Sequence, residues 1–335
     1  MERGITIKEI AEQAGVSIGT VSRIINNQPF GYSQETYERV QEVIRRSGYV
    51  PNRIARAMVT KKSYTIAYLV DDICNPFFPE IAKGISRYAA KEGFNMILCD
   101  GGQDQDQIRE QFKRLYESGI DGIIAGAYVL SEKNVDFLLK SRLPFVVLDA
   151  NMTEPCFSNI SVDNYAGARM MTEYLISCGH KKIACITGSS EFASSRRRLS
   201  GYKAAMAEYG LDWNDLIIEG DYTVEGGRNA AAVLSTTDCT AIFAFNDLTA
   251  IGACNYLQEN GIRIPEDISV AGFDDIAMAS LMYPPLTTIR QPLFEMGEGA
   301  AELLIQSVKD GGVGKVRSEK YELSLVKRKS VLEIQ

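Results

Sequence analysis

Near the start of the chain, apolar residues repeat at the spacing of a helix. They stand three or four residues apart and therefore share one helix face: Ile7, Ile10, Ala11 and Ala14. The string Thr6-Ile7-Lys8-Glu9 has the form of a capping box, in which the Thr and Glu side chains bond each other's backbone amides. Gly15 follows, and glycine readily adopts the left-handed conformation that ends a helix. The pattern predicts a short amphipathic helix between Thr6 and Gly15.

A second short helix is expected directly afterwards. Ser17 can cap a helix that runs through Thr20–Ile25, and the next residues end it: Asn26, Asn27 and Pro29. Two short helices joined by a glycine-containing turn form the helix-turn-helix pattern. Among its outward positions, Arg23 can pair with a guanine edge and Ser22 can bond phosphate. On this pattern alone, a DNA-binding helix and a plain helical hairpin both remain open.

A third helix and a short fourth one complete this region. Ser33 is the expected cap of the third helix, which ends at Ser47-Gly48 and has an apolar stripe of Val40, Val43 and Ile44. Pro51 then favours an extended chain at the residue before it. Residues 52–59 have helical character, but an isolated helix of this length is unstable in water. We expect it to order only against a partner.

Beyond residue 62 the pattern changes to apolar runs that alternate with amphipathic stretches. The expected strands are Thr65–Val70, Asn95–Cys99, Gly122–Ala125, Phe145–Leu148, Lys182–Thr187, Ala241–Phe245 and Ile268–Gly272. The expected helices include Pro79–Lys91, Gln105–Glu117, Ala166–Ser177 and Leu199–Tyr209. Such alternation predicts parallel sheets covered by helices, and its extent predicts two α/β lobes. Ligands of open parallel sheets bind beyond the carboxyl ends of the strands, so a cleft between the lobes is the expected site.

Polar and aromatic residues stand where several of these strands end. Phe77 follows the first strand, Tyr128 the third, and Asp149 ends the fourth. Further candidates are Asn246, Asp274, Tyr222 and, in an expected loop before Gly201, the triplet Arg196-Arg197-Arg198. Carboxylates, an amide and a guanidinium around aromatic rings suit a polyhydroxyl ligand. The alternatives are that Asp and Asn act only as turn formers, that the Arg triplet is a solvated loop, and that the aromatics belong to the core.

Charge is distributed unevenly along the chain. Residues 1–62 hold ten Lys and Arg against six Glu, whereas the remainder holds 26 basic and 37 acidic residues, for a net charge of −7. A basic N-terminal region and an acidic remainder are consistent with one region that binds a polyanion and another that binds a different ligand. The seven cysteines are scattered and contain no Cys-x-x-Cys pair, which favours free thiols over disulfides or a zinc site. The polar N-terminus predicts no signal peptide and a cytoplasmic location.

The first sixty residues resemble a known family. The string TIKEIAEQAGVSIGTVSRIINN, followed by GYVPNRIARAM, closely resembles the lactose-repressor family of bacterial regulators. The resemblance implies that the second helix reads the major groove and that the segment after Asn52 is a hinge helix, whose wedge into the minor groove is Met58 here. Met58 replaces the usual Leu, and Gly19 replaces a bulkier residue, so operator specificity does not transfer. The implied DNA contacts are Thr6, Ser17, Ile18, Gly19, Thr20, Ser22, Arg23, Asn26, Asn52, Arg53, Ala55 and Met58.

The body resembles the effector domain of the same family, which is similar to periplasmic sugar-binding proteins. The resemblance rests on NPFFPEI, DGIIAGA, VDNYAGARMMTEYLISCGHKKIACITG, RRRLSGY, GDYTVEGGRNA, AIFAFNDLTAIGA and ISVAGFDD. It implies effector contacts at Phe77, Tyr128, Asp149, Arg198, Tyr222, Asn246 and Asp274, with Arg198 chosen because it stands three residues before Gly201. The expected effector is a sugar. Purines, nucleosides and a phosphocarrier protein are the family's other options, and induction and co-repression both remain open.

The expected organisation is a helix-turn-helix domain at 1–49, a hinge at 50–62 and an effector and dimerisation domain at 63–335. Its lobes are expected at roughly 63–161 plus 290–322, and at 162–289 plus 323–335. No leucine heptads follow Ser330, so we expect a homodimer on a palindromic operator, with no cofactor and no metal. A solute-binding protein would leave the helix-turn-helix unexplained. An enzyme lacks support, because the single histidine, His180, has no nucleophile elbow beside it and the phosphate-loop spacing is absent.

Overall fold

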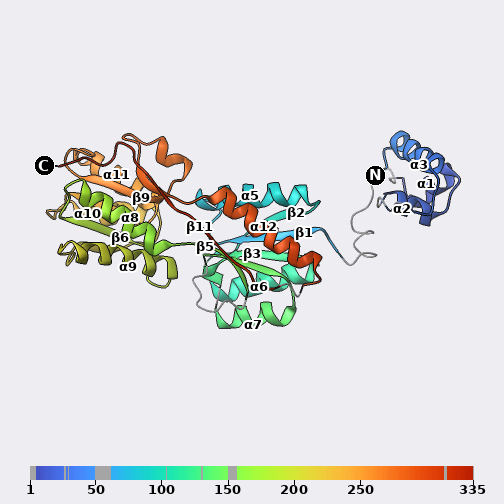
Figure 1. The fold of residues 1–335 in the computed structure, drawn as a ribbon, viewed down its shortest axis with the longest axis horizontal. Helices are drawn as coiled ribbons and strands as arrows, with labels where there is room; N and C mark the ends of the chain where they lie inside the picture. Colours follow the sequence, from blue (N-terminus) through green and yellow to red (C-terminus); the bar gives the residue numbers. More distant parts are fainter. Residues whose placement is uncertain are drawn as a thin grey trace. The chain divides into compact units, whose positions relative to one another are not determined.

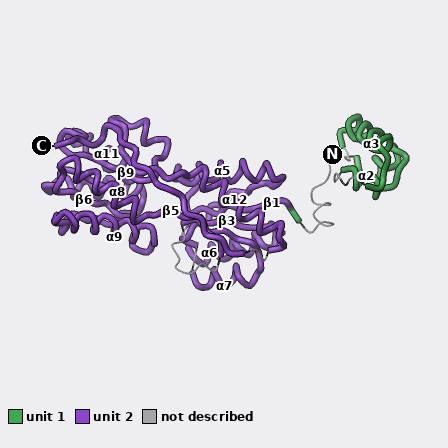
Figure 2. Tube along the Cα trace, in the orientation of Figure 1, with its two compact units in different colours: residues 1–63 green, residues 64–335 purple. Residues whose placement is uncertain are grey.

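The structure is a computed structural model that describes residues 5–25, 28, 30–49, 62–102, 104–129, 131–149, 157–312 and 315–334. The chain divides into two compact units, residues 1–63 and 64–335, which are coloured separately in Figure 2. Five expected DNA contacts lie outside the described residues: Asn26, Asn52, Arg53, Ala55 and Met58.

The described residues of the first unit form three helices. They are α1 (Ile7–Ala14), α2 (Ile18–Ile25) and α3 (Gln34–Ser47). The expected capping box is present, because the Glu9 amide donates to the Thr6 hydroxyl at 3.4 Å and the Thr6 amide donates to the Glu9 carboxylate at 2.7 Å. Gly15 ends α1 with φ 63°, in the left-handed region. The turn chemistry read from the sequence therefore sets the boundaries of α1.

A small apolar core holds these three helices together. Its fully buried side chains are Ile10, Ala11, Ala14, Val21, Ile24 and Val40. Ser33 caps α3, as expected, by accepting from the Thr36 amide at 3.2 Å, and Gly48 ends it with φ 64°. The stripe residues Val43 and Ile44 pack on the core beside Val40. The unit is thus a three-helix module in which the outward face of α2 is not used for packing.

The second unit contains two six-stranded sheets. The first has the order β11-β5-β4-β3-β1-β2 and is parallel throughout. Its strands are β1 (Thr65–Val70), β2 (Asn95–Asp100), β3 (Gly122–Gly126), β4 (Phe145–Leu148), β5 (Ser158–Val162) and β11 (Ser318–Tyr321). Helices α5 (Phe77–Lys91) and α12 (Leu293–Lys309) cover one face, and α6 (Gln105–Glu117) and α7 (Glu132–Ser141) cover the other. Figure 1 shows these layers, which make up the N-terminal lobe.

The second sheet forms the C-terminal lobe and has the order β12-β10-β9-β8-β6-β7. Its strands are β6 (Ile183–Thr187), β7 (Ile217–Glu219), β8 (Ala241–Ala244), β9 (Ser269–Asp274), β10 (Thr287–Arg290) and β12 (Ser324–Val326), of which only β12 pairs antiparallel. Helices α8 (Asn164–Ser177) and α9 (Ala193–Glu208) pack on one face, and α10 (Val224–Leu234) and α11 (Asp247–Glu259) on the other.

The chain crosses between the two sheets three times. The crossings join β5 to α8, β10 to α12, and β11 to β12. Figure 1 shows the last of them, in dark red, running along both lobes. Because every crossing is short, residues at the crossings lie at the junction of the lobes.

The sequence pattern located the long buried strands and helices well. β1, β4 and α6 have the expected bounds, and the other expected strands and helices shift by a few residues. One expectation was wrong: the triplet Arg196-Arg197-Arg198 lies within α9, not in a loop. The expected helix began only at Leu199, whereas α9 begins at Ala193 and so includes the triplet. Gly201 lies inside the helix, where a Cβ would overlap the Tyr165 carbonyl of α8. Gly201 therefore allows two helices to approach closely and does not end one.

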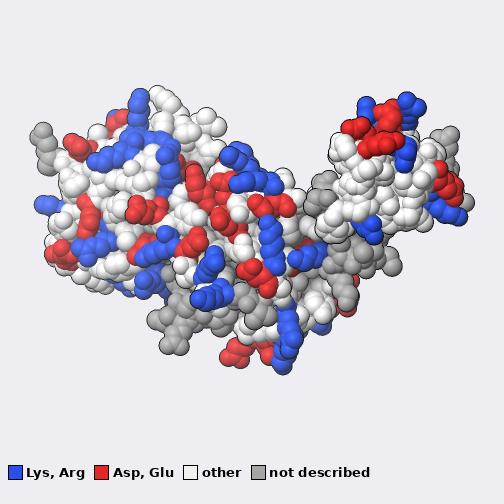
Figure 3. Space-filling model, turned by 45° about the vertical axis from the view of Figure 1, so that its right-hand side comes forward, with Lys and Arg blue, Asp and Glu red and all other residues white. Residues whose placement is uncertain are grey.

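No helix in the described part of the chain is long and apolar enough to span a bilayer. On the face of the larger unit shown in Figure 3, Lys and Arg are interspersed with Asp and Glu.

Candidate functional site

The outward face of α2 is a candidate surface for DNA. Ser17 caps the helix, because its hydroxyl accepts from the Thr20 amide at 3.1 Å. Ile18, Gly19 and Arg23 are exposed, and Ile18 keeps 47% of its surface in solvent, whereas Val21 and Ile24 are buried on the opposite face. An exposed isoleucine at the start of a capped helix next to an Arg has the shape and chemistry of a major-groove reader.

Arg23 is placed by the turn after α2. Gly31 has φ 89°, and a Cβ there would lie 2.8 Å from one guanidinium nitrogen of Arg23. The guanidinium therefore lies over a backbone position that only glycine accommodates. Of the expected DNA contacts, Thr6, Ser17 and Thr20 also cap or buttress the two helix starts, so their hydroxyls have structural partners in this structure.

A buried polar cluster in the C-terminal lobe centres on Arg198. This side chain is 5% exposed, while Arg196 and Arg197 point to solvent. Its Nε donates to Asn164 Oδ1 at 2.7 Å, one terminal nitrogen donates to the Phe245 carbonyl, and the other lies 3.8 Å from Asp274 Oδ1. Its guanidinium carbon lies 3.7 Å from the centre of the Phe273 ring, a stacking contact typical of Arg.

The cluster reaches both lobes through the crossings. Asn164, at the crossing from β5, donates to Asp149 at the end of β4 at 2.7 Å. Gln291, at the crossing into α12, donates to Asp274 at 2.7 Å. Hydrogen bonds and one ion pair therefore connect Asp149, Asn164, Arg198, Asp274 and Gln291 in a single chain. Each of these groups is therefore linked, directly or through a neighbour, to a residue at a crossing between the lobes.

Two carboxyl groups in this chain have unusual proton affinity. Burial raises the pKa of Asp274 to about 7, and Arg198 and Gln291 only partly offset this effect. Burial likewise raises the pKa of Asp149 to about 6, against the opposing effect of Arg198. Groups of this kind change between acceptor and donor near neutral pH, and they concentrate at functional sites.

The backbone of the same residues is unusual as well. Asp149 has φ 61°, Tyr222 has φ 67° and Asp274 has φ 120°, although none is glycine. Left-handed backbone at Asp and Tyr costs free energy and is retained mainly at ligand sites and switch regions. Three of the residues singled out from the sequence share this property.

An aromatic pair borders the cluster. The rings of Phe192 and Tyr222 stack with centroids 6.0 Å apart and planes 28° apart. The Tyr222 ring lies directly on Gly188, where a Cβ would overlap ring carbons. Asn246 donates to the Tyr222 carbonyl at 3.0 Å and also caps α11 by accepting from the Thr249 amide at 2.9 Å. The backbone thus holds two aromatic rings beside the cluster, and the buried Tyr222 hydroxyl has no hydrogen-bond partner among the described residues.

The remaining candidates, Phe77 and Tyr128, belong to the N-terminal lobe. Phe77 begins α5 and packs edge-to-face on Phe78, with centroids 5.1 Å apart. Tyr128 lies in the turn Ala127–Val129 after β3, and its buried hydroxyl has no hydrogen-bond partner among the described residues. Among the described residues, no hydrogen bond, ion pair or ring contact joins these two residues to the Arg198 cluster. They lie at the carboxyl-end edge of the first sheet, which Asp149 shares.

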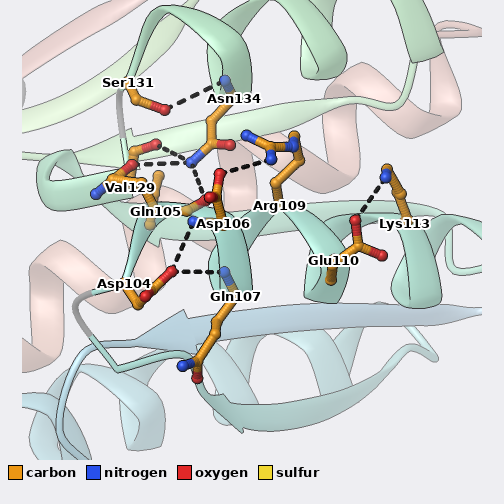
Figure 4. Close-up of polar contacts among 10 residues, drawn as sticks. All are labelled: Asp104, Gln105, Asp106, Gln107, Arg109, Glu110, Lys113, Val129, Ser131 and Asn134. Atoms are coloured by element: carbon orange, nitrogen blue, oxygen red, sulfur yellow. Dashed lines mark hydrogen bonds and ion pairs between the residues drawn. The ribbon is translucent and has the colours of Figure 1, made fainter.

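Polar contacts on the α6–α7 side fix the turn that carries Tyr128. Gln105 donates to the Tyr128 carbonyl at 2.8 Å, and Asn134 donates to Gln105 at 2.9 Å and to the Val129 carbonyl at 3.0 Å. Figure 4 shows Asn134 of α7 reaching Gln105 and Val129, while Asp104 caps α6. Tyr128 is therefore held by the ends of two helices.

Sequence reasoning missed several residues of the site. Asn164, Gln291 and Phe192 contact the predicted residues directly, and Asp71 and Tyr68 lie near Tyr128. Asp71 follows a strand directly, which is the signal that marked Asp149 and Asp274, and it could have been found that way. Asn164, Gln291 and Phe192 carry no such signal, since they lie at crossings or before a helix.

Both regions of the chain match family models. A model described as "Bacterial regulatory proteins, lacI family" matches residues 6–52. A model described as "Periplasmic binding proteins and sugar binding domain of LacI family" matches residues 63–327.

Individual relatives extend this similarity over almost the whole chain. The HTH-type transcriptional repressor PurR of Vibrio campbellii is 37% identical over 309 residues, covering 91% of this chain and 92% of the relative. The lac repressor dimer, solved bound to operator and the anti-inducer ONPF, is 28% identical with TM-score 0.87 and covers 98% of this chain and 100% of that one. A LacI family regulator from Enterococcus faecium, solved with bound ribose, is 31% identical with TM-score 0.75, covering 81% and 100%.

Proposed function

The chain belongs to the LacI family of bacterial regulatory proteins and is a DNA-binding transcriptional repressor rather than an enzyme, and we propose that a purine base or nucleoside controls it by binding between its two lobes. A repressor of this kind acts in the cytoplasm, where its operator lies. A phosphocarrier protein is a further partner that only the family resemblance raises.

The observation that carries the purine proposal is the aromatic pair beside the Arg198 cluster. A purine is flat and has donors and acceptors along its edges. The stacked rings of Phe192 and Tyr222 offer it a face, and Arg198, Asp149 and Asp274 offer its edges both donors and acceptors. The similarity to a repressor named PurR favours this branch of the family over the sugar that the sequence alone suggested.

A sugar is the second candidate. The regulator from Enterococcus faecium carries ribose, and the carboxylates and guanidinium of the Arg198 cluster also suit adjacent hydroxyls. A nucleoside contains both a purine and a ribose, so the two candidates share part of their chemistry. Direct comparison of bases, nucleosides and free sugars separates them.

We propose that the effector controls DNA binding through the linked hydrogen bonds and ion pair that run from Asp149 to Gln291. An effector bonded to Arg198 or Asp274 changes contacts at two of the three crossings, and so biases how the lobes sit on each other. The lobes in turn bias the segment that leads to the DNA-binding unit. Such coupling is reciprocal, so operator DNA changes effector affinity by the same factor.

We further propose that the repressor is a homodimer. The segment around the short helix η2 (Ala277–Ser280) exposes large apolar side chains: Met278 at 44%, Leu281 at 82% and Tyr283 at 90%. Neighbouring exposed apolar residues of this size mark interaction surfaces. The lac repressor was solved as a dimer on operator, and a two-fold protein matches a palindromic site.

The effector proposal is tested by thermal unfolding of the full chain against purine bases, nucleosides and sugars. A ligand at 100 times its dissociation constant adds about 2.7 kcal/mol to the stability of the native state. We expect a clear rise in melting temperature with a purine or its nucleoside and none with hexoses. Stabilisation by a free sugar alone would replace the purine proposal with the sugar.

The DNA proposal is tested with Arg23→Ala on an operator recovered by selection from random duplexes. One lost guanine contact costs about 1–3 kcal/mol, which corresponds to a loss of affinity of roughly 5-fold to 150-fold. The control is Arg39→Ala. Arg39 is an exposed residue of α3, and among the described residues its ion-pair partner is Glu35, at 4.0 Å. Equal losses in both variants would show that Arg23 contributes only general charge.

A further inference from the structure

Four polar atoms in the N-terminal lobe are buried without a hydrogen-bond partner among the described residues. One, Asn134 Oδ1, lies on α7, and the other three lie on or just after β1 and β3: the hydroxyls of Tyr68 and Tyr128 and the Oδ1 atom of Asp71. Tyr68 is 1% exposed. A buried polar group without a partner costs free energy, and native proteins contain few of them. Three in one place indicate a position that a ligand completes.

These atoms lie close together. The charge of Asp71 contributes to raising the pKa of both Tyr68 and Tyr128, after burial itself, and Tyr68 contributes to the shift at Tyr128. Asp71 follows β1 directly, and Tyr128 follows β3, which is the neighbouring strand. We call Tyr68, Asp71 and Tyr128 the acidic pocket.

The surroundings of the acidic pocket are negatively charged. Burial raises the pKa of Asp71 to about 6, the charges of Asp72 and Asp100 add to this shift, and hydrogen bonds from the Asp71 and Asp72 backbone amides partly oppose it. None of the three carboxylates forms an ion pair with another described residue. A ligand group here meets acceptors and negative charge, so an amino group is favoured and a phosphate is repelled.

The acidic pocket and the Arg198 cluster are within reach of one ligand. In the first sheet β4, β3, β1 and β2 are successive neighbours, and Asp149, Tyr128, Asp71 and Asp100 stand at or just beyond their carboxyl ends. Neighbouring strands are roughly 4.8 Å apart, so Asp149 and Asp71 end strands separated by roughly 10 Å. That span is comparable to a purine or a nucleoside.

We propose that the acidic pocket binds an amino group, so that the effector is an unphosphorylated, amino-bearing ring compound such as an aminopurine. This inference rests on the effector site proposed above. Asp71 accepts from the amino group, and the Tyr68 and Tyr128 hydroxyls donate to neighbouring acceptors on the ring. The same pocket excludes nucleotides and sugar phosphates, because Asp71, Asp72 and Asp100 oppose a phosphate.

The test is calorimetric titration of the full chain with matched ligand pairs: adenine with hypoxanthine, adenosine with its monophosphate, and glucosamine with glucose. In the wild type, we expect the amino-bearing ligand to bind at least tenfold more tightly than its partner without the amino group, and adenosine at least tenfold more tightly than its monophosphate. Asp71→Asn is expected to abolish the preference for the amino group. Asp72→Asn, an exposed change at the next position, is the matched control and keeps the preference.

The outcomes separate this proposal from the purine proposal. If glucosamine binds through Asp71 and no purine binds, the purine proposal fails and the amino-group proposal stands. If hypoxanthine binds as tightly as adenine and Asp71→Asn changes neither, the purine proposal stands and the amino-group proposal is wrong. Tight binding of the monophosphate would also overturn the amino-group proposal.

A second measurement needs no ligand. Since the Oδ1 atom of Asp71 is buried without a partner, the neutral Asp71→Asn variant is expected to melt a few degrees above the wild type at pH 8. Asp72→Asn removes only a neighbouring exposed charge and is expected to raise the melting temperature by less. A lower melting temperature for Asp71→Asn would show that the carboxylate is satisfied within the protein, and would overturn the proposal even if no ligand in the panel binds.

Discussion

The two halves of the candidate effector site differ in how their polar groups are satisfied. In the half that centres on Arg198, hydrogen bonds and one ion pair link the side chains from Asp149 to Gln291. In the acidic pocket, the three polar atoms of Tyr68, Asp71 and Tyr128 have no partner among the described residues. The first half is largely organised before a ligand arrives, with only the buried Tyr222 hydroxyl lacking a partner among its described residues, whereas the second is completed by the ligand. A ligand that supplies the missing bonds favours the arrangement of the lobes in which both halves reach it.

The largest expected effect breaks the bonded half. Arg198→Met leaves the Asp274 and Asp149 carboxylates buried without their cation, and breaking a buried pair in this way costs about 3–5 kcal/mol. We expect a correspondingly lower unfolding free energy at pH 8 and no effector binding, measured by urea denaturation and calorimetry. The control is Arg197→Met, at the exposed neighbouring position in α9. The guanidinium carbon of Arg197 lies 5.9 Å from the centre of the Tyr165 ring. If Arg198→Met is as stable as this control, the contacts of Arg198 with the buried carboxylates do not contribute to stability.

A second change displaces the aromatic surface of the same half. In Gly188→Ala, the new methyl group overlaps the Tyr222 ring, and accommodating it costs about 1–3 kcal/mol. Effector affinity should fall because the ring can no longer lie flat beside Phe192. Adding Tyr222→Ala to this variant removes the clash, so stability should recover while affinity stays low. Unchanged affinity in Gly188→Ala would separate the Tyr222 ring from ligand binding.

The pH dependence of stability sharpens the comparison further. Burial raises the pKa of Asp274 to about 7 and that of Asp71 to about 6, so the folded state holds protons that the unfolded state has released. Their contribution to stability is fully present below the ordinary carboxyl value of 3.8 and is lost progressively as pH rises from there to about 6 for Asp71 and about 7 for Asp274. His180 acts oppositely: burial lowers its pKa below 6.5, and its contribution is lost as pH falls below that value.

Asp274→Asn should flatten the loss of stability that occurs as pH rises from the ordinary carboxyl value of 3.8 to about 7. One titrating proton corresponds to a slope of at most about 1.4 kcal/mol per pH unit. Urea denaturation across this pH range measures the slope in the variant and the wild type. Identical slopes would mean that Asp274 does not titrate in this range.

The smallest expected effect concerns the support of the acidic pocket. Gln105→Ala removes the bonds to the Tyr128 carbonyl and to Asn134, a loss of about 1 kcal/mol. Effector affinity should fall a few-fold because the turn that carries Tyr128 is held less firmly. Gln107→Ala, an exposed change one half-turn away in α6, is the control (Figure 4). If both variants bind effector equally well, the turn is held by Asn134 and Val129 alone.

Local sequence signals determined the first unit almost completely. Its helix boundaries follow from groups close together in the chain, such as Thr6 with Glu9 and Gly15 in its left-handed conformation. The buried strands of the second unit were also readable, because parallel strands covered on both faces are continuous apolar runs. The short strands β7, β11 and β12 were not, since each is partly exposed and lacks such a run.

The sequence by itself selected the candidate residues, because strand ends and family motifs are local features. Only the tertiary structure decided which of them meet. It buried Arg198 and left Arg196 and Arg197 in solvent, although the three are identical in kind, because the packing of α8 and α9 at Gly201 fixes which side of the helix faces inward. It also brought Asn164 to Asp149 and Gln291 to Asp274 within one cluster, from crossings 127 positions apart in the sequence. Burial and partner choice depend on contacts between distant segments, and no local pattern in the chain records them.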